Sequence, residues 1–148
     1  MRYSKVIFVS EDDTYSSPVA AALLAKQMSR YNISVESKGM VVLFNEPANP
    51  KGVSILKEMG YDISKHMSTQ LGEQDFGIDT LILVMSEKGK RDAYANYKKS
   101  VNVYTIKEFV GSSGDVEVPY GRGIEEYKDN IDKLNTIVMQ VAEKLILG

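Results

Sequence analysis

Residues Lys5–Pro18 read KVIFVSEDDTYSSP and predict a buried strand, a short loop and the start of a helix. The run Lys5–Val9 is rich in β-branched and aromatic residues, which is typical of a strand buried on both faces. Ser17 and Pro18 predict the helix start, with serine as the N-cap and proline at the first helical position. We expect this alanine-rich helix to run from Pro18 to about Tyr31. Such a unit aims free N–H groups and the positive end of a helix dipole at one place, which suits an anion.

The side chains of the same loop disfavour the binding of an anion. Glu11, Asp12 and Asp13 are all acidic, and no Lys or Arg occurs between Lys5 and Lys26. One carboxylate about 6 Å from a phosphate dianion repels it by roughly 5 kcal/mol at an effective dielectric constant of about 20. Two interpretations of the carboxylates remain open. They form either a solvated turn or a site for a cation, a guanidinium group or a basic segment of a partner protein.

Composition limits the class of protein. The chain has 148 residues, of which 43% are hydrophobic and 26% charged, and this predicts one globular domain spanning 1–148. A net charge of −2 does not favour binding to nucleic acid or to an anionic membrane. With no apolar run of membrane-spanning length and no signal-peptide pattern, we expect a cytoplasmic protein. The absence of cysteine excludes a thiolate nucleophile, and a single histidine, His66, argues against a metal site, so we predict neither metal nor cofactor.

Predicted strands and helices alternate along the rest of the chain. This order predicts an α/β three-layer sandwich, in which a central four-stranded parallel sheet binds ligands at the carboxyl ends of its strands. The last helix carries a one-sided apolar stripe of Ile124, Tyr127, Ile131, Leu134, Val138, Val141 and Leu145. The further predicted strands are Ile33–Ser37, Thr80–Met85 and Val101–Thr105, the further helices are Pro50–Met59, Glu87–Tyr97 and one beginning near Ile124, and a long irregular loop covers residues 111–123.

The first loop and several later segments resemble one family. A strand, an eight-residue loop, Ser-Pro and an alanine-rich helix are similar to the low-molecular-weight protein-tyrosine-phosphatases and the related arsenate reductases and bacterial protein-arginine phosphatases, whose loop reads V-C-x-G-N-x-C-R-S-P. The resemblance covers nearly the whole chain and implies the fold of that family. The further matching segments are Ser37–Gly39, Gly60–His66, Asp79–Met85 and Gly114–Gly121, with Tyr127 downstream.

The resemblance also implies where the family's catalytic groups would lie. The cysteine nucleophile falls on Ser10, the arginine that clamps the phosphoryl oxygens falls on Ser16, and the aspartate that protonates the leaving group falls on Val118. A serine hydroxyl needs an adjacent base before it can attack phosphorus. Loss of the guanidinium removes the dominant stabilisation of phosphoryl transfer, and valine cannot donate a proton. Ser10 and Ser16 also fit a purely structural interpretation as turn and cap residues.

The other loop positions shape the expected pocket. The family's glycine and asparagine fall on Asp12 and Asp13, so Asp12 is the residue for which we expect a positive φ. The second loop cysteine falls on Tyr15, whereas Thr14 and Ser17 match the motif. In the resembling arginine phosphatases, a threonine at the position of Thr14 favours phosphoarginine over phosphotyrosine.

Three functional hypotheses follow from these residues. The first is a catalytically inactive pseudophosphatase that binds a protein or basic peptide through its acidic loop. The second is an active phosphatase that uses Asp12, Asp13, Asp115 or Glu117 as acid or base, with or without a metal ion, and the third is a structural homodimer. We also expect His66 to be a structural hydrogen-bonding residue that follows a strand, and Tyr94 and Tyr97 to form a packing edge of their helix.

Overall fold

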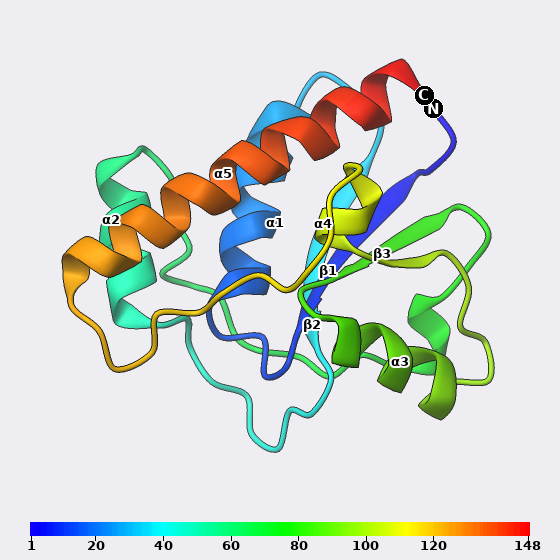
Figure 1. The fold of residues 1–148 in the computed structure, drawn as a ribbon, viewed down its shortest axis with the longest axis horizontal. Helices are drawn as coiled ribbons and strands as arrows, with labels where there is room; N and C mark the ends of the chain where they lie inside the picture. The colour runs from blue at the N-terminus through cyan, green and yellow to red at the C-terminus, as the bar shows by residue number, and fades with distance from the viewer.

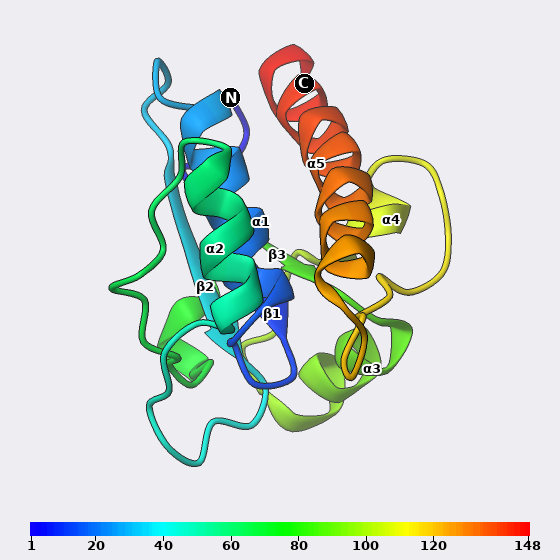
Figure 2. The same ribbon diagram turned by 90° about the vertical axis from the view of Figure 1, so that its left-hand side faces the viewer.

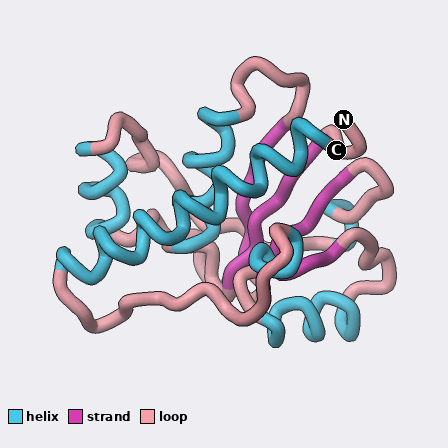
Figure 3. The backbone as a smooth tube through the Cα atoms, turned by 45° about the horizontal axis from the view of Figure 1, so that its top comes forward, coloured by secondary structure: helices cyan, strands magenta, loops and turns pink.

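The computed structural model describes residues 1–148 and contains one parallel sheet. Its strands lie in the order β2-β1-β3-β4, and each neighbouring pair is parallel. Figure 3 shows the strands side by side, with the long C-terminal helix running obliquely to them. The predicted α/β fold with a four-stranded parallel sheet is confirmed. The strands are β1 (Lys5–Ser10), β2 (Ser34–Gly39), β3 (Thr80–Val84) and β4 (Val103–Thr105).

Helices cover both faces of the sheet. In Figure 1, α5 crosses diagonally in front of α1, and Figure 2 shows α1, α2 and α5 grouped together with α3 apart from them. No helix combines the length and apolar character that a bilayer span requires. The helices are α1 (Ser16–Gln27), α2 (Pro50–Glu58), α3 (Glu87–Asn96), α4 (Ile106–Phe109) and α5 (Ile124–Leu147), with a short 3₁₀ turn η1 (Glu73–Asp75).

The core has two layers because successive side chains of a strand point to opposite faces. Val6 and Phe8 of β1 face the larger layer, which contains residues of α1, α2, α4 and α5. Ile7 and Val9 face the smaller layer, together with Ala93 of α3. All four strand residues are buried, so β1 is buried on both faces as its composition predicts. The sheet therefore holds the end of β1 rigidly at the centre of the domain.

Several predicted boundaries differ from the structure. Helix α1 begins at Ser16 and ends at Gln27, so Ser17 lies in its first turn and Pro18 is not its first residue. The N-cap residue is Tyr15, whose side chain makes no capping hydrogen bond. The apolar stripe of α5 is buried as predicted except at its first position, where Ile124 is 40% exposed. Ser17, which we assigned to the cap, instead forms hydrogen bonds with the side chains of Ser10 and Asp13.

The helix α4 was not predicted. It contains only four residues, and its start is held by a capping box in which Thr105 accepts from the N–H of Glu108 and Glu108 accepts from the N–H of Thr105. Thr105 is also the last residue of β4, which is shorter than the predicted Val101–Thr105 strand. A helix of this length shows no apolar periodicity that a sequence pattern could detect.

The loops that follow β1 and β2 lie at one end of the sheet, together with the segment before α5 (Figure 1). The N–H of Met40 donates to the carbonyl of Ser10 over 3.0 Å, and the N–H of Val116 donates to the carbonyl of Met85 over 2.8 Å. Both termini lie at the opposite side of the molecule (Figure 1), where Arg2 and Gly148 line one pocket. The carboxyl ends of the strands therefore present the first loop, residues 40–48 and residues 111–123 as neighbours, which is where this fold class binds its ligands.

Candidate functional site

A chain of hydrogen bonds closes the inner side of the loop between β1 and α1. The Oγ atoms of Ser10 and Ser17 lie 2.6 Å apart, and Ser17 donates to Oδ1 of Asp13 over 2.8 Å. Because Ser17 has one hydroxyl proton and gives it to Asp13, its oxygen accepts the proton of Ser10. The backbone N–H of Asp13 in turn donates to Oγ of Ser10 over 3.2 Å. The side chains of Ser10, Ser17 and Asp13 thus form one connected unit.

Asp13 is the buried centre of this unit. Its side chain is fully buried, and Oδ2 accepts from the N–H of Thr69 over 3.1 Å. Burial raises the pKa of the Asp13 carboxyl, against hydrogen bonds from Ser37, Ser17 and Thr69 that lower it. His66 Nε2 lies 2.7 Å from the carbonyl oxygen of Asp13 and 3.6 Å from its Oδ2. The predicted hydrogen-bonding role of His66 is confirmed, although the residue lies in a loop and follows no strand.

The positive φ of the loop falls on Asp13, with φ 59°, and not on Asp12 as the resemblance led us to expect. Aspartate and asparagine tolerate this left-handed conformation better than most residues, because their short polar side chains bond locally. The family asparagine corresponds to Asp13, so the carboxylate occupies a position that needs this backbone conformation. Asp13 is buried inside the loop, whereas Glu11 and Asp12 are exposed to solvent. That the loop carboxylates repel phosphate stays a prediction.

Tyr15 fixes the loop to the helical layer. Its side chain is 1% exposed, and its hydroxyl donates to Oδ1 of Asn130 in α5 over 2.7 Å. The ring packs edge-on against Tyr127, with centroids 5.1 Å apart. Burial raises the pKa of the Tyr15 hydroxyl, so this group stays protonated and acts as a donor.

The outer side of the loop is exposed. Glu11 and Asp12 are open to solvent, and Oδ1 of Asp12 accepts both from the N–H of Thr14 over 3.2 Å and from its hydroxyl over 2.8 Å. This local bonding is typical of an aspartate that stabilises a turn. Glu11 and Asp12 form no ion pair with any Lys or Arg. The backbone N–H groups that donate to no protein acceptor are those of Glu11, Asp12, Tyr15, Ser16 and Ser17. The loop thus keeps free donors at a helix N-terminus and places two exposed carboxylates beside them.

The position of the family's clamp is filled by Ser16, which is 3% exposed. Its side chain makes no hydrogen bond, and it precedes Ser17 in the first turn of α1 without capping the helix. No guanidinium or ammonium group forms an ion pair with a loop carboxylate. Ser16 itself is uncharged, so it cannot hold phosphoryl oxygens as a guanidinium would.

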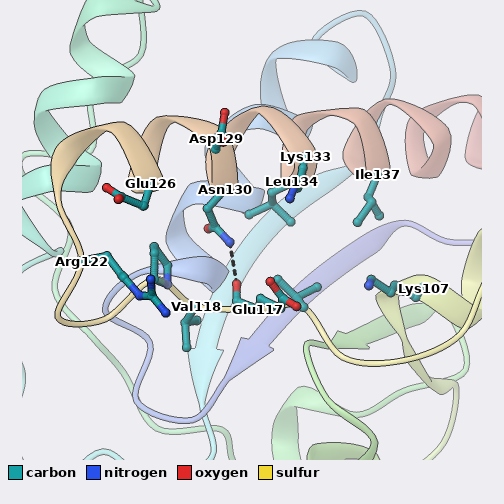
Figure 4. Close-up of a pocket in the computed structure, with 12 residues that line it drawn as sticks. Lys107, Glu117, Val118, Arg122, Glu126, Asp129, Asn130, Lys133, Leu134 and Ile137 are labelled. Carbon is teal, nitrogen blue, oxygen red and sulfur yellow. Dashed lines mark hydrogen bonds between the residues drawn. The ribbon is translucent and has the colours of Figure 1, made fainter.

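The position of the family's general acid is filled by Val118, which is 44% exposed on residues 111–123. Asn130 Nδ2 donates to the carbonyl of Glu117 over 2.6 Å, and Figure 4 shows this bond between α5 and the segment. A cavity of about 460 Å³ separates the two elements. Asp115 is engaged elsewhere, because its Oδ1 accepts from the N–H of Glu87 at the start of α3. No group of three His, Cys, Asp or Glu side chains is arranged to hold a metal ion.

Two residues of the site were missed by the sequence interpretation. Asn130 joins the hydroxyl of Tyr15 to the carbonyl of Glu117, and Thr69 supplies the N–H that the Asp13 carboxylate accepts. Asn130 lies on the polar flank of a clear apolar stripe, and Thr69 acts through its backbone. Neither position carries a motif, so only the tertiary structure reveals them. Helix α3 ends at Asn96, one residue before its predicted end, and Tyr97 packs as predicted, with its ring centroid 5.2 Å from that of Phe76.

Comparisons with known proteins agree on one family. Residues 5–146 match the family model described as low molecular weight phosphotyrosine protein phosphatase. The protein-arginine-phosphatase of Geobacillus stearothermophilus is 33% identical over 144 residues, which covers 95% of each chain. The low molecular weight protein tyrosine phosphatase from T. tengcongensis superimposes with a TM-score of 0.88 at 35% identity, covering 95% of this chain and 98% of that one.

A third similar structure bears on the position of Ser10. It is a YwlE arginine phosphatase in which serine replaces a cysteine and the active-site serine is phosphorylated. The TM-score is 0.86 at 32% identity, and 95% of each chain is covered. The sheet order, the loop geometry and the match over residues 5–146 lead to one conclusion. This chain belongs to the low molecular weight phosphotyrosine protein phosphatase family.

Proposed function

We propose that this chain is a pseudophosphatase, a protein that keeps the phosphatase frame, does not hydrolyse phosphate esters and binds a basic segment of a partner protein. The observation that carries the proposal is the loop itself, in which the exposed carboxylates of Glu11 and Asp12 lie next to free N–H groups and no cation pairs with them. A phosphate dianion would meet these two charges without a clamp at Ser16. An arginine or lysine side chain would meet complementary charge.

Three further observations support inactivity. Ser10 offers a hydroxyl in place of a thiolate, and a serine hydroxyl ionises far above pH 7. Ser16 is buried and uncharged, and Val118 has no proton to give. Two similar proteins are named protein-arginine-phosphatases, a name that implies phosphorylated arginine in a protein as substrate, so we choose an arginine-containing segment as the ligand to test.

Activity is tested with p-nitrophenyl phosphate and with a phosphoarginine peptide. The protein-arginine-phosphatase of Geobacillus stearothermophilus serves as the positive control in the same plate. We expect no turnover by the wild type, with or without Mg²⁺ or Mn²⁺, and none by Ser10→Cys alone, because the clamp and the acid are still missing. Turnover by the wild type that disappears in Ser10→Ala would contradict inactivity.

Binding is tested by fluorescence anisotropy with a labelled peptide that contains two arginines. The affinity should fall in the Glu11→Gln/Asp12→Asn double variant and should fall with added salt. Glu125→Gln is the matched control, because its side chain is exposed on α5 and pairs only with Lys128 over 3.9 Å. Equal affinities for the wild type and the double variant would show that the acidic loop is not the binding site.

A second candidate function is favoured by the hydrogen-bonded unit of Ser10, Ser17 and Asp13. If Ser10 attacks phosphorus, its proton passes to Ser17 Oγ and the Ser17 proton passes to the Asp13 carboxylate, while the leaving group departs with its bonding electrons. A donor such as acetyl phosphate needs no proton from Val118, because its leaving group is a weak base. The phosphorylated serine in the similar YwlE structure supports this reaction.

This second function is checked by intact-mass spectrometry after incubation with acetyl phosphate. Acceptance by Ser10 predicts the added mass of one phosphoryl group in the wild type and its absence in Ser10→Ala. An unchanged mass in the wild type removes this candidate and leaves the binding function standing.

A further inference from the structure

An apolar patch borders the acidic loop. We use this name for Val41, Leu43 and Phe44, whose side chains are 52%, 81% and 75% exposed. The N–H of Val41 donates to the carbonyl of Glu11 over 2.9 Å. The segment that carries the patch therefore lies beside the loop that carries the exposed carboxylates. In Figure 1 this segment, in cyan, extends beyond the loop after β1 at the carboxyl end of the sheet.

The segment that carries the patch is held firmly by hydrogen bonds. Gln70 Oε1 accepts from the N–H of Val42 over 2.7 Å, Asn45 Nδ2 donates to the carbonyl of Ser68 over 2.6 Å, and Ser68 Oγ accepts from the N–H of Glu46 over 2.8 Å. The backbone is therefore ordered while its large apolar side chains point into solvent. Exposed apolar side chains gathered at one place mark sites of interaction with other molecules.

The charged residues around the apolar patch indicate which kind of molecule binds there. Glu11, Asp12 and Glu46 are exposed, and none of them forms an ion pair. A symmetric dimer through this surface would bring two such acidic rims together, which is unfavourable. A segment that carries both an apolar side chain and a cation would cover the patch and satisfy the carboxylates.

We propose that the apolar patch and the acidic loop form one docking surface for a partner segment in which leucine, phenylalanine or methionine lies within two residues of arginine. The inference rests on the proposed function and adds the second half of the recognised sequence. The arginine contacts Glu11 and Asp12, and the neighbouring apolar side chain covers Leu43 and Phe44. Affinity then depends on both halves of the surface.

The test uses three labelled ten-residue peptides in anisotropy titrations with the full chain. The first contains arginine next to leucine, the second arginine next to serine, and the third glutamate next to leucine. Because burial of one leucine side chain stabilises by about 1.5 to 3 kcal/mol, the first peptide should bind about tenfold or more tightly than the second. The third should not bind.

Variants assign this difference to the patch. Leu43→Ser/Phe44→Ser should remove the preference for leucine and leave the arginine–serine peptide unchanged. Ile78→Ser is the matched control, because Ile78 is 78% exposed but precedes β3 at the opposite end of the sheet. Circular dichroism spectra of both variants check that they fold.

Each outcome has a separate meaning. Equal binding of the two arginine peptides, still dependent on Glu11 and Asp12, overturns the inference and leaves the proposed function intact. Failure of every arginine peptide to bind overturns the proposed function. Equal binding of the glutamate peptide rejects the charge argument. Sedimentation showing a dimer that Leu43→Ser/Phe44→Ser dissolves identifies a second copy of this chain as the occupant and overturns the inference as well.

Discussion

The loop of residues 10–17 and the segment of residues 111–123 meet at the carboxyl ends of the strands but are built differently. In the loop, Asp13, Tyr15, Ser16 and Ser17 are buried. In the segment no residue is buried, and three glycines with positive φ form its turns. The loop folds through contacts that do not involve a thiolate or a guanidinium group. Its frame therefore persists without the catalytic side chains, whereas the acid position on the exposed segment can change at almost no structural cost.

The largest expected effect is loss of the buried carboxylate. Asp13→Ala leaves the N–H of Thr69 and the hydroxyl of Ser17 without their acceptor and places alanine at φ 59°. We expect the free energy of unfolding to fall by about 2 to 4 kcal/mol, measured by urea denaturation. Glu11→Ala, at an exposed position of the same loop, should change it by less than about 0.5 kcal/mol. Similar losses of unfolding free energy in Asp13→Ala and Glu11→Ala would show that the inner and outer sides of the loop contribute equally to stability.

The anchor to α5 should have the next largest effect. Tyr15→Phe removes the hydroxyl that Asn130 Oδ1 accepts, in a buried setting. The expected destabilisation is about 1 to 2 kcal/mol, read from the same urea transitions. Tyr31→Phe provides the control, because the Tyr31 ring is 39% exposed and its hydroxyl makes no hydrogen bond. If Tyr15→Phe leaves the free energy of unfolding unchanged, packing of the ring alone holds the loop.

The pH dependence of stability sharpens the comparison further. Because burial raises the pKa of Asp13, the folded protein binds this proton more tightly than the unfolded chain. The contribution of Asp13 is thus fully present below about pH 4 and is lost as pH rises through the raised pKa. From pH 4 to pH 8 the stability of Asp13→Asn should therefore rise relative to that of the wild type, measured by urea denaturation at both values. A fall in the stability of Asp13→Asn relative to the wild type toward pH 8 would refute this linkage.

The smallest effect belongs to the exposed segment. Val118→Asp restores the side chain that the family uses as an acid, at a half-exposed position. Stability should change by less than about 0.5 kcal/mol, and p-nitrophenyl phosphate should still not be hydrolysed, because Ser10 and Ser16 are unchanged. A melting curve and the activity assay on one preparation test both statements. A loss of several kcal/mol would show that this segment is as tightly built as the loop.

The sequence predicted the elements that rest on strong local patterns. The apolar runs of β1 and β3 and the stripe from Tyr127 to Leu145 predicted the sheet and the last helix. The helix start was misplaced because Ser17 bonds across the loop to Ser10 and Asp13, although its residue type is typical of an N-cap. A short polar residue serves a cap and a tertiary contact equally well, so sequence alone could not separate the two.

The candidate site was predictable in its positions and not in its orientations. The resemblance located Ser10, Ser16 and Val118, but nothing local showed that Asp13 turns inward while Glu11 and Asp12 stay in solvent. That difference depends on Thr69 and His66, which are more than fifty positions away along the chain. It is decided by tertiary contacts, which a motif does not contain.

The side chain of Asn130 links two separate segments of the site. One amide group accepts from the Tyr15 hydroxyl and donates to the carbonyl of Glu117, so it ties both walls of the site to the same turn of α5. A displacement of either wall is therefore passed to the other through a single side chain. A partner that pulls on the first loop would also shift the cavity beside α5, and hydrogen exchange in the two walls should slow or quicken together.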